Sequence, residues 1–234
     1  MLRLFVPGAH ARDGAVHIVG PELRHLQTLR LAPGALLVVL DDGGTEHEVV
    51  LETVTAREAV ARILRSARPE RESPLELVLA AALVKGSKMD LVVEKATELG
   101  VQRIVPVETR RAVARGDHSD RWRRIAVAAA KQSGRTRIPL VDAPQPLAVV
   151  VAEPWPGLRL MPWEGEASRR IGDLPAGARA VTVLIGPEGG FATDEVALAE
   201  AHGFVPLTLG PRILRAETAA ITIVALCQRR WGDG

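Results

Sequence analysis

The sequence predicts an α/β protein in which a small, strand-rich N-terminal domain precedes a larger domain with a mainly parallel sheet. Three observations support this prediction. Short β-branched segments divided by turns fill residues 1–70, a charged stretch bounded by prolines covers residues 68–74, and strand–loop–helix units repeat from residue 75 onward. Such alternation is typical of a parallel sheet covered by helices, and a polar, proline-bounded stretch is typical of a domain boundary. We therefore expect domains at residues 1–70 and 73–234.

The N-terminal domain is expected to form a small β-barrel. Its strand candidates are rich in β-branched residues and are separated by glycine, proline and aspartate residues that favour turns. They lie at residues 5–6, 16–19, 35–40, 48–54 and 59–64. Residues 21–29 are the exception, and they predict one short helix.

The larger domain begins with the strongest strand signal of the chain. Residues 75–84 form a continuous apolar run, as expected for a strand buried on both faces of a parallel sheet. The next helix begins at Ser87, places apolar residues at helical spacing and ends at Gly100. Further strands are expected at residues 103–107, 158–162, 180–185 and 205–209, and further helices at 119–133 and from about 193 and 218.

The composition is that of a globular protein with basic residues of one kind. Hydrophobic residues make up 47% of the chain, and the formal net charge is +2. Most of the 30 basic residues are arginines, which suit bidentate phosphate contacts and stacking on bases. No segment approaches the ~20 apolar residues that span a membrane, so we expect a soluble, cytoplasmic protein with no membrane contact.

Cysteine and histidine usage argues against two kinds of site. The single cysteine, Cys227, cannot form an intramolecular disulfide, and it lies in an apolar helical run where a buried thiol is expected. The six histidines show none of the spacings typical of metal ligands. We therefore expect neither a disulfide nor a metal site.

The first unusual loop is residues 185–191, IGPEGGF, which follow a predicted strand. Glycines remove side chains where the backbone bends sharply or approaches a ligand, and ligands of open α/β sheets bind at the carboxyl ends of strands. The spacing matches neither phosphate-binding glycine motif, and the carboxylate of Glu188 would repel a phosphate. The loop is therefore either a tight turn or a binding loop for an uncharged or cationic ligand, such as the sulfonium of S-adenosylmethionine.

The second unusual loop covers residues 207–220 and places Arg215 and Glu217 between a strand end and an apolar helix. These two residues are either a surface ion pair, which contributes little, or a functional pair. The helix that follows is apolar on most sides, so it is buried in the core or at a subunit interface. The second possibility favours a homodimer.

Five segments, in this order along the chain, resemble the ribosomal small-subunit (16S) RNA uridine-N3 methyltransferase family of the SPOUT class. They are residues 25–30, residues 83–89 with 95–100, residues 129–135, and the two loops at 185–191 and 209–219. The resemblance implies a SPOUT-type domain with a C-terminal trefoil knot, preceded by a PUA-like barrel that binds RNA. It also implies that the knotted domains form a homodimer and that the partner is small-subunit ribosomal RNA or the 30S particle.

The resemblance further implies that S-adenosylmethionine binds in the knot loops. The residues it assigns to the cofactor are Met161, Trp163, Leu184, Ile185, Gly186, Pro187, Glu188, Gly189, Gly190, Leu209, Gly210, Ile213, Leu214, Thr218 and Ala219. Methylation of uridine N3 requires loss of the imide proton and stabilisation of the charge left on the carbonyl oxygens. We expect Arg215 to stabilise that charge and Glu217 to act as the base or to orient Arg215.

Basic residues near the expected cleft and in the barrel are candidates for RNA contacts. They are Arg3, Arg24, Arg30, Lys85, Lys88, Arg110, Arg111, Lys131 and Arg135. Three other functions stay open from the residues alone: a non-catalytic RNA-binding assembly factor, a nucleotide-dependent α/β enzyme, and a SPOUT methyltransferase acting on another base or a ribose 2′-hydroxyl. The acidic first loop and the missing phosphate-binding lysine count against the nucleotide-dependent enzyme.

Overall fold

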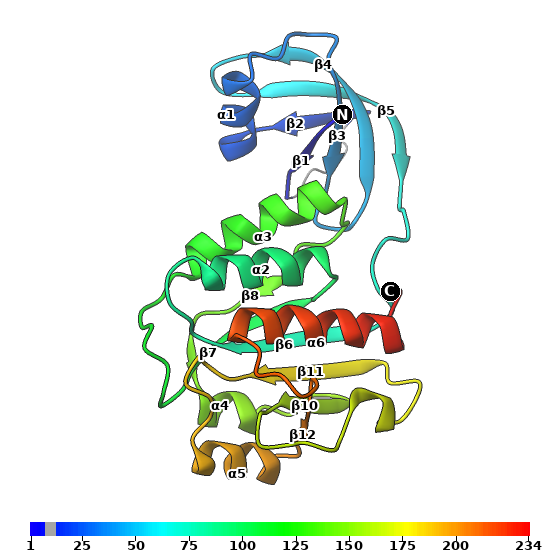
Figure 1. Cartoon of the computed structure of the whole chain (residues 1–234). Helices are drawn as coiled ribbons and strands as arrows, with labels where there is room; N and C mark the ends of the chain where they lie inside the picture. The colour runs from blue at the N-terminus through cyan, green and yellow to red at the C-terminus, as the bar shows by residue number, and fades with distance from the viewer. Residues whose placement is uncertain (8–12) are drawn as a thin grey trace. The chain divides into compact units, whose positions relative to one another are not determined.

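The computed structural model describes residues 1–7 and 13–234, which form two compact units (Figure 1). The first unit comprises residues 1–72 together with 130–137, and the second comprises residues 73–129 and 138–234. These units differ from the predicted domains in one respect. Residues 130–137, which follow the boundary in sequence, pack with the first unit.

The first unit consists of a five-stranded sheet and one helix. Its elements are β1 (Leu2–Phe5), β2 (Ala15–Ile18), α1 (Gly20–Thr28), β3 (Leu36–Leu40), β4 (Glu46–Val54) and β5 (Ala59–Ala67). The order across the sheet is β1-β3-β4-β5-β2, and only the β1–β3 pair is parallel. All five predicted strands and the predicted helix are confirmed, with shifts of a few residues at their ends.

A single apolar cluster forms the core of the first unit. Leu4, Val39 and Val49 from three strands are fully buried against Leu26 of α1. The pairing of β4 with β5 is irregular at two places, and such bulges increase the twist and bend of a strand. The sheet curls as the predicted barrel requires, but among the described strands β1 and β2 remain its two edges.

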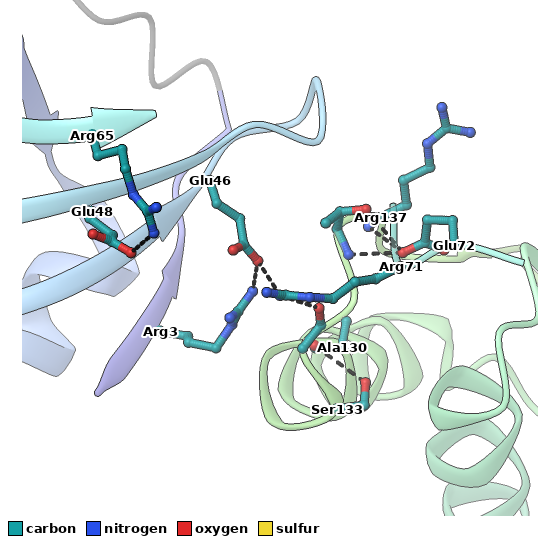
Figure 2. A network of polar contacts seen from close by, with 11 residues as sticks. Arg3, Glu46, Glu48, Arg65, Arg71, Glu72, Ala130, Ser133 and Arg137 are labelled. Atoms are coloured by element: carbon teal, nitrogen blue, oxygen red, sulfur yellow. Dashed lines mark hydrogen bonds and ion pairs between the residues drawn. The ribbon is translucent and has the colours of Figure 1, made fainter. Parts of the chain in front are cut away.

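Glu72 holds residues 135–137 within the first unit, and Figure 2 shows it beside Arg137. One carboxylate oxygen accepts hydrogen bonds from the backbone N–H groups of Thr136 (2.8 Å) and Arg137 (3.0 Å). The other accepts from Nη2 (2.7 Å) and Nε (3.1 Å) of Arg135, whose side chain is buried. Burial opposes ionisation of Glu72, but Arg135 and the backbone donors outweigh it and hold the pKa of this carboxyl below its usual value.

A second carboxylate of the first unit, Glu46, contacts two arginines (Figure 2). Glu46 pairs with Arg3 and accepts a 2.7 Å hydrogen bond from Arg71. The same Arg71 guanidinium donates to the carbonyl oxygen of Gly134 at 3.1 Å. Glu46, acting through Arg71, and Glu72 together hold residues 134–137 within the first unit.

The second unit is built on a seven-stranded parallel sheet. Its strands are β6 (Glu76–Ala82), β7 (Arg103–Glu108), β8 (Leu140–Val141), β9 (Gln145–Pro146), β10 (Leu158–Pro162), β11 (Ala180–Ile185) and β12 (Val205–Leu207). Its helices are α2 (Lys88–Glu98), α3 (Ser119–Ser133, whose last residues belong to the first unit), α4 (Leu147–Ala152), α5 (Thr193–Ala201) and α6 (Ala216–Trp231), with a short 3₁₀ turn at Ile171–Asp173. The order is β12-β10-β11-β6-β7-β8, and β9 pairs with β7.

Helices cover both faces of this sheet, so the unit has three layers (Figure 1). On one face α2 and α6 lie side by side and pack on Leu77 and Leu79 of β6. On the other face α4 and α5 pack on Val78 and Ala80 of the same strand. Burial on both faces explains why β6 reads as a continuous apolar run. Over residues 1–7 and 13–234, no helix is long and apolar enough to cross a membrane.

A buried glutamine near the end of α6 is hydrogen-bonded to the segment where the chain enters the second unit. The side-chain amide of Gln228, near the end of α6, donates to the carbonyl oxygen of Leu99 at 2.7 Å. Its oxygen accepts a 2.7 Å hydrogen bond from the Ser73 hydroxyl, at the point where the chain enters the unit. Both polar groups of Gln228 are thereby satisfied, as buried polar groups usually are.

Candidate functional site

The loops that follow five of the parallel strands meet at one edge of the sheet. Because the strands are parallel, their carboxyl ends lie at the same edge, and this edge is where ligands of α/β sheets bind. The loops are residues 83–87, 109–118, 163–170, 186–192 and 208–215. Both glycine-containing loops singled out in the sequence are among them.

Two adjoining cavities lie between these loops. The first, of about 390 Å³, is lined by residues 162–164, 166–167, 170 and 208–214 together with Ala219. The second, of about 430 Å³, is lined by residues 185–191 and 213–216 and by Pro162, Glu164 and Ala219. Pro162, Glu164, Ile213, Leu214 and Ala219 line both, so the two cavities share a wall.

The loop at 186–192 needs glycine at one position in particular. Gly190 has a φ of +66°, in the left-handed region that side chains rarely adopt. A Cβ atom added there would collide with the carboxylate of Glu164, which belongs to the loop after β10. The loop turns back through a 3.0 Å hydrogen bond from the Gly190 N–H to the Pro187 carbonyl. Gly190 therefore supplies the left-handed conformation that this turn needs, and a side chain there would also displace the Glu164 carboxylate.

A buried carboxylate joins this loop to the one after β7. One oxygen of Glu195 accepts from the backbone N–H of Ala192 (2.8 Å), and the other accepts from the backbone N–H of Arg110 (2.7 Å). Arg110 also forms an ion pair with Asp194. The sequence signal for Glu195 was its place in the first turn of α5, where a carboxylate satisfies free N–H groups. Its second role, as a link to Arg110, could not be seen in the sequence.

Lys88 lies between two carboxylates at the second cavity. Its Nζ is 3.0 Å from Oε1 of Glu188 and 3.9 Å from Oε2 of Glu217. Glu188 also accepts from the backbone N–H of Lys85 at 3.4 Å. Burial opposes its ionisation, but its own backbone N–H, Lys88 and the Lys85 N–H outweigh that effect and lower the pKa of Glu188.

The two predicted catalytic residues occupy different environments at the start of α6. Arg215 is exposed, precedes the first helical residue and lines the second cavity. Glu217 is 8% exposed, and its Oε2 atom is buried without a hydrogen-bond partner among the described residues. Arg215 therefore places a cation at the second cavity, and the buried oxygen belongs to Glu217, two residues later in the sequence.

Most residues predicted to hold the cofactor line one of the two cavities. They are Trp163, Ile185, Gly186, Pro187, Glu188, Gly189, Gly190, Leu209, Gly210, Ile213, Leu214 and Ala219. Met161 and Leu184 do not, because their side chains are fully buried in the core on the face covered by α4 and α5. Thr218 is exposed on α6 and is absent from both linings.

Sequence reasoning missed much of the wall formed by the loop after β10. Glu164, Glu166 and Arg170 line the first cavity, with Thr208 and Arg212 opposite them. Backbone N–H donation from Ser168, together with the Ser168 hydroxyl and the Arg169 N–H, lowers the pKa of Glu166 to about 2. The resemblance implies that this turn binds the cofactor, but which of its side chains line the cavity appears only in the three-dimensional arrangement.

The predicted RNA-binding residues differ in how far they are already engaged. In the second unit, Lys85 is exposed, Lys88 and Arg110 pair with carboxylates, and Arg111 donates to the Gly189 carbonyl at 3.0 Å. In the first unit Arg24 and Arg30 are exposed. Three others of the first unit are held by carboxylates of the same unit: Arg3 by Glu46, Lys131 by Glu22 and Arg135 by Glu72.

No group of three or more histidine, cysteine, aspartate or glutamate side chains in residues 1–7 and 13–234 could hold a metal ion. Comparison with known proteins points to a family. A family model described as an RNA methyltransferase domain matches residues 71–228. A ribosomal RNA small subunit methyltransferase E from Mycobacterium bovis is 35% identical, over 93% of this chain and 89% of its own length.

Two solved structures share the fold over nearly their whole length. A Legionella pneumophila protein in complex with S-adenosylmethionine superposes with a TM-score of 0.92 at 34% identity, covering 100% of this chain and 99% of its own. A ribosomal RNA small subunit methyltransferase E from Neisseria gonorrhoeae, bound to S-adenosylmethionine, gives a TM-score of 0.91 at 32% identity, with the same coverage.

Proposed function

We propose a function for this chain from one premise: it belongs to the ribosomal RNA small subunit methyltransferase E family. The proposed function is methyl transfer from S-adenosylmethionine to small-subunit ribosomal RNA. The finer proposal is that the methyl group goes to N3 of a uridine. The residues around Glu217 support this choice of atom.

The loops and carboxylates that line the two adjoining cavities suit S-adenosylmethionine. The cavities are formed by backbone-rich loops in which Gly190 allows close approach, and Glu164 and Glu188 bring carboxylates toward a cationic ligand. Ile213 lines both cavities and is 89% exposed, so an adenine ring held there would cover it. When bound, the cofactor supplies a methyl group activated by the sulfonium. Two relatives of known structure were solved with this cofactor.

The observation on which the uridine proposal depends is the unsatisfied oxygen of Glu217. A buried acceptor without a donor costs roughly 1–3 kcal/mol, and Glu217 Oε2 is such an acceptor within the described residues. The N3–H group of uridine is a donor that could satisfy it, and the carboxylate could then take the imide proton. Cytidine has no proton at N3, so this arrangement favours uridine.

Two cations can stabilise the charge that deprotonation leaves on the uracil carbonyl oxygens. Arg215 lines the second cavity, and the ammonium of Lys88 lies 3.9 Å from the same Glu217 oxygen. Fixed positive groups at the places where negative charge develops lower a barrier more than mobile water does. N3 of a paired uridine is engaged in base pairing, so the target must be unpaired or extruded.

Three further features are proposed because only the resemblance implies them. They are a trefoil knot in the C-terminal part of the larger unit, an RNA-binding PUA-like barrel in the first unit, and a homodimer. RNA affinity is proposed to come from basic side chains, and the exposed members of the predicted set are Arg24, Arg30, Lys85, Arg110 and Arg111. Binding is then expected to weaken steeply as salt concentration rises.

Replacing Glu217 by glutamine tests the proposed role of its carboxylate. Glu217→Gln keeps the size of the side chain but cannot accept the proton, so kcat should fall by about 100-fold or more. The Kd for S-adenosylmethionine should stay unchanged. Glu200→Gln, an exposed change on α5, is the matched control and should behave as wild type. Wild-type kcat in Glu217→Gln would contradict the role of Glu217.

A further inference from the structure

A third cavity lies at the same edge of the sheet, outside the two already described. It has a volume of about 430 Å³ and lies between the loops after β6 and β7 and the starts of α2 and α3. Its inner wall is apolar and includes Val84, Met89 and Trp122, all of them buried. None of its lining residues has a part in the proposed methyl-transfer site except Lys85, an RNA-contact candidate.

The charge of this cavity is opposite to that of its neighbour. Lys85, Arg115 and Arg121 line it together with one carboxylate, Asp90, which pairs with Arg121. The second cavity, in contrast, is lined by two carboxylates and one arginine. The lining of the third cavity therefore attracts the phosphates of RNA, whereas the second cavity suits a cationic cofactor and an uncharged base.

An exposed aromatic side chain stands at the rim of the cavity. The His118 ring meets the Trp122 ring edge to face, with 5.8 Å between their centres and 81° between their planes. Trp122 is buried by this packing, whereas His118 is exposed. Unpaired RNA bases stack on histidine and on other aromatic side chains, and cations beside such a platform hold the phosphates.

The third cavity is directly connected to the proposed reaction centre. Lys85 lines the third cavity, and its backbone N–H donates to Glu188, which lines the second. Three residues later on the same turn, Lys88 contacts both Glu188 and Glu217. A target uridine at Glu217 would therefore lie beside the turn that carries Lys85, a residue of the third cavity.

We propose that the third cavity is a subsite for a nucleotide next to the methylated one. Its base lies against His118 and the apolar wall, and its phosphate lies against Arg115 and Lys85. This inference rests on the proposed function, because it takes RNA as the substrate. The subsite would anchor the flanking nucleotide while the target base is held away from its partners in the stack.

The phosphate contact is tested by RNA binding of the full chain at several salt concentrations. Fluorescence anisotropy with labelled oligouridylate should show about tenfold weaker binding for Arg115→Ala than for wild type. The slope of log affinity against log salt should fall by about 0.7, the value for one phosphate of a single strand. Arg124→Ala is the matched control, since this exposed arginine lies on α3 outside the cavity lining.

The base contact is tested with RNAs that carry one abasic nucleotide beside the mapped target uridine. One such position should weaken binding of the wild type by roughly tenfold. The same abasic RNA should not weaken binding of His118→Ala further, because the stacking partner is already gone. Equal affinities of wild type, Arg115→Ala and Arg124→Ala, or equal losses in both variants, would overturn the subsite.

Failure of the subsite and failure of the proposed function give different results. If the wild type methylates small subunits but His118→Ala and Arg115→Ala bind RNA as the wild type does, only the subsite is wrong. If the wild type transfers no methyl group, the proposed function is wrong whatever the variants do, and the subsite inference is overturned with it.

Discussion

Removal of the Glu72 carboxylate should destabilise the first unit more than an ordinary surface change does. Glu72 accepts hydrogen bonds from two backbone N–H groups and from the Arg135 guanidinium, whose side chain is 4% exposed. Hydrogen bonds to charged groups contribute about 1.5–3 kcal/mol, and loss of one partner of a buried ion pair costs about 3–5 kcal/mol. Arg135 keeps other contacts, so we expect Glu72→Ala to lower the free energy of unfolding by about 2–4 kcal/mol.

Urea unfolding of the full chain, followed by circular dichroism, measures this loss. Glu70→Ala is the matched control, because Glu70 is exposed and precedes Glu72 by two residues. Equal losses in the free energy of unfolding for Glu72→Ala and Glu70→Ala, or losses below ~0.5 kcal/mol in both, as for ordinary surface changes, would show that the Glu72 contacts do not stabilise the unit.

The stability that the Glu72–Arg135 pair contributes depends on pH. The pKa of Glu72 is lowered from its ordinary value of 4.5 on folding, so its stabilising contribution is complete above that value. As the pH falls through the lowered pKa of the folded state, the carboxyl takes up a proton and the contribution is lost. The stability difference between wild type and Glu72→Ala should therefore be constant near neutral pH and shrink below pH 4.5.

Three further predictions concern the second unit. Gly190→Ala should weaken S-adenosylmethionine binding about tenfold by calorimetry, because the backbone there has a positive φ that side chains rarely adopt. Gly172→Ala, where φ is ordinary and space is open, should bind as wild type. Gln228→Ala removes two buried hydrogen bonds and should cost about 1–3 kcal/mol in urea unfolding. Burial raises the pKa of the Cys227 thiol to about 12, so it should react with a thiol reagent at pH 8 only after denaturation, and rapid reaction of the native protein would contradict this packing.

Much of the fold could be predicted because its signals are local. The apolar run before Val84 predicted β6, and the spacing of apolar residues between Ser87 and Gly100 predicted α2; the structure confirms both, at Glu76–Ala82 and Lys88–Glu98. The short elements β8, β9 and α4 were not predicted, because segments of two to six residues carry too little periodicity. The return of residues 130–137 to the first unit depends on contacts of Glu72 and Arg71, which are distant in sequence.

The candidate site shows the same division between local and long-range signals. The glycine loops could be found because their residue types are unusual after strands. Leu184 was assigned to the cofactor but faces the opposite core, since side chains alternate along β11 and its neighbour Ile185 takes the cavity side. The contact of Lys88 with Glu188, 100 residues apart, and the unsatisfied oxygen of Glu217 appear only in three dimensions.

The proposed methylation of uridine at N3 is tested by identification of the product. Small subunits from a strain that lacks the modification are incubated with the full-length protein and methyl-labelled S-adenosylmethionine. The ribosomal RNA is then digested to nucleosides and analysed by mass spectrometry. We predict that the label is found in 3-methyluridine and that it disappears with Glu217→Gln. Label in a ribose 2′-O-methyl nucleoside, or in another base, would contradict N3 of uridine as the methylated atom.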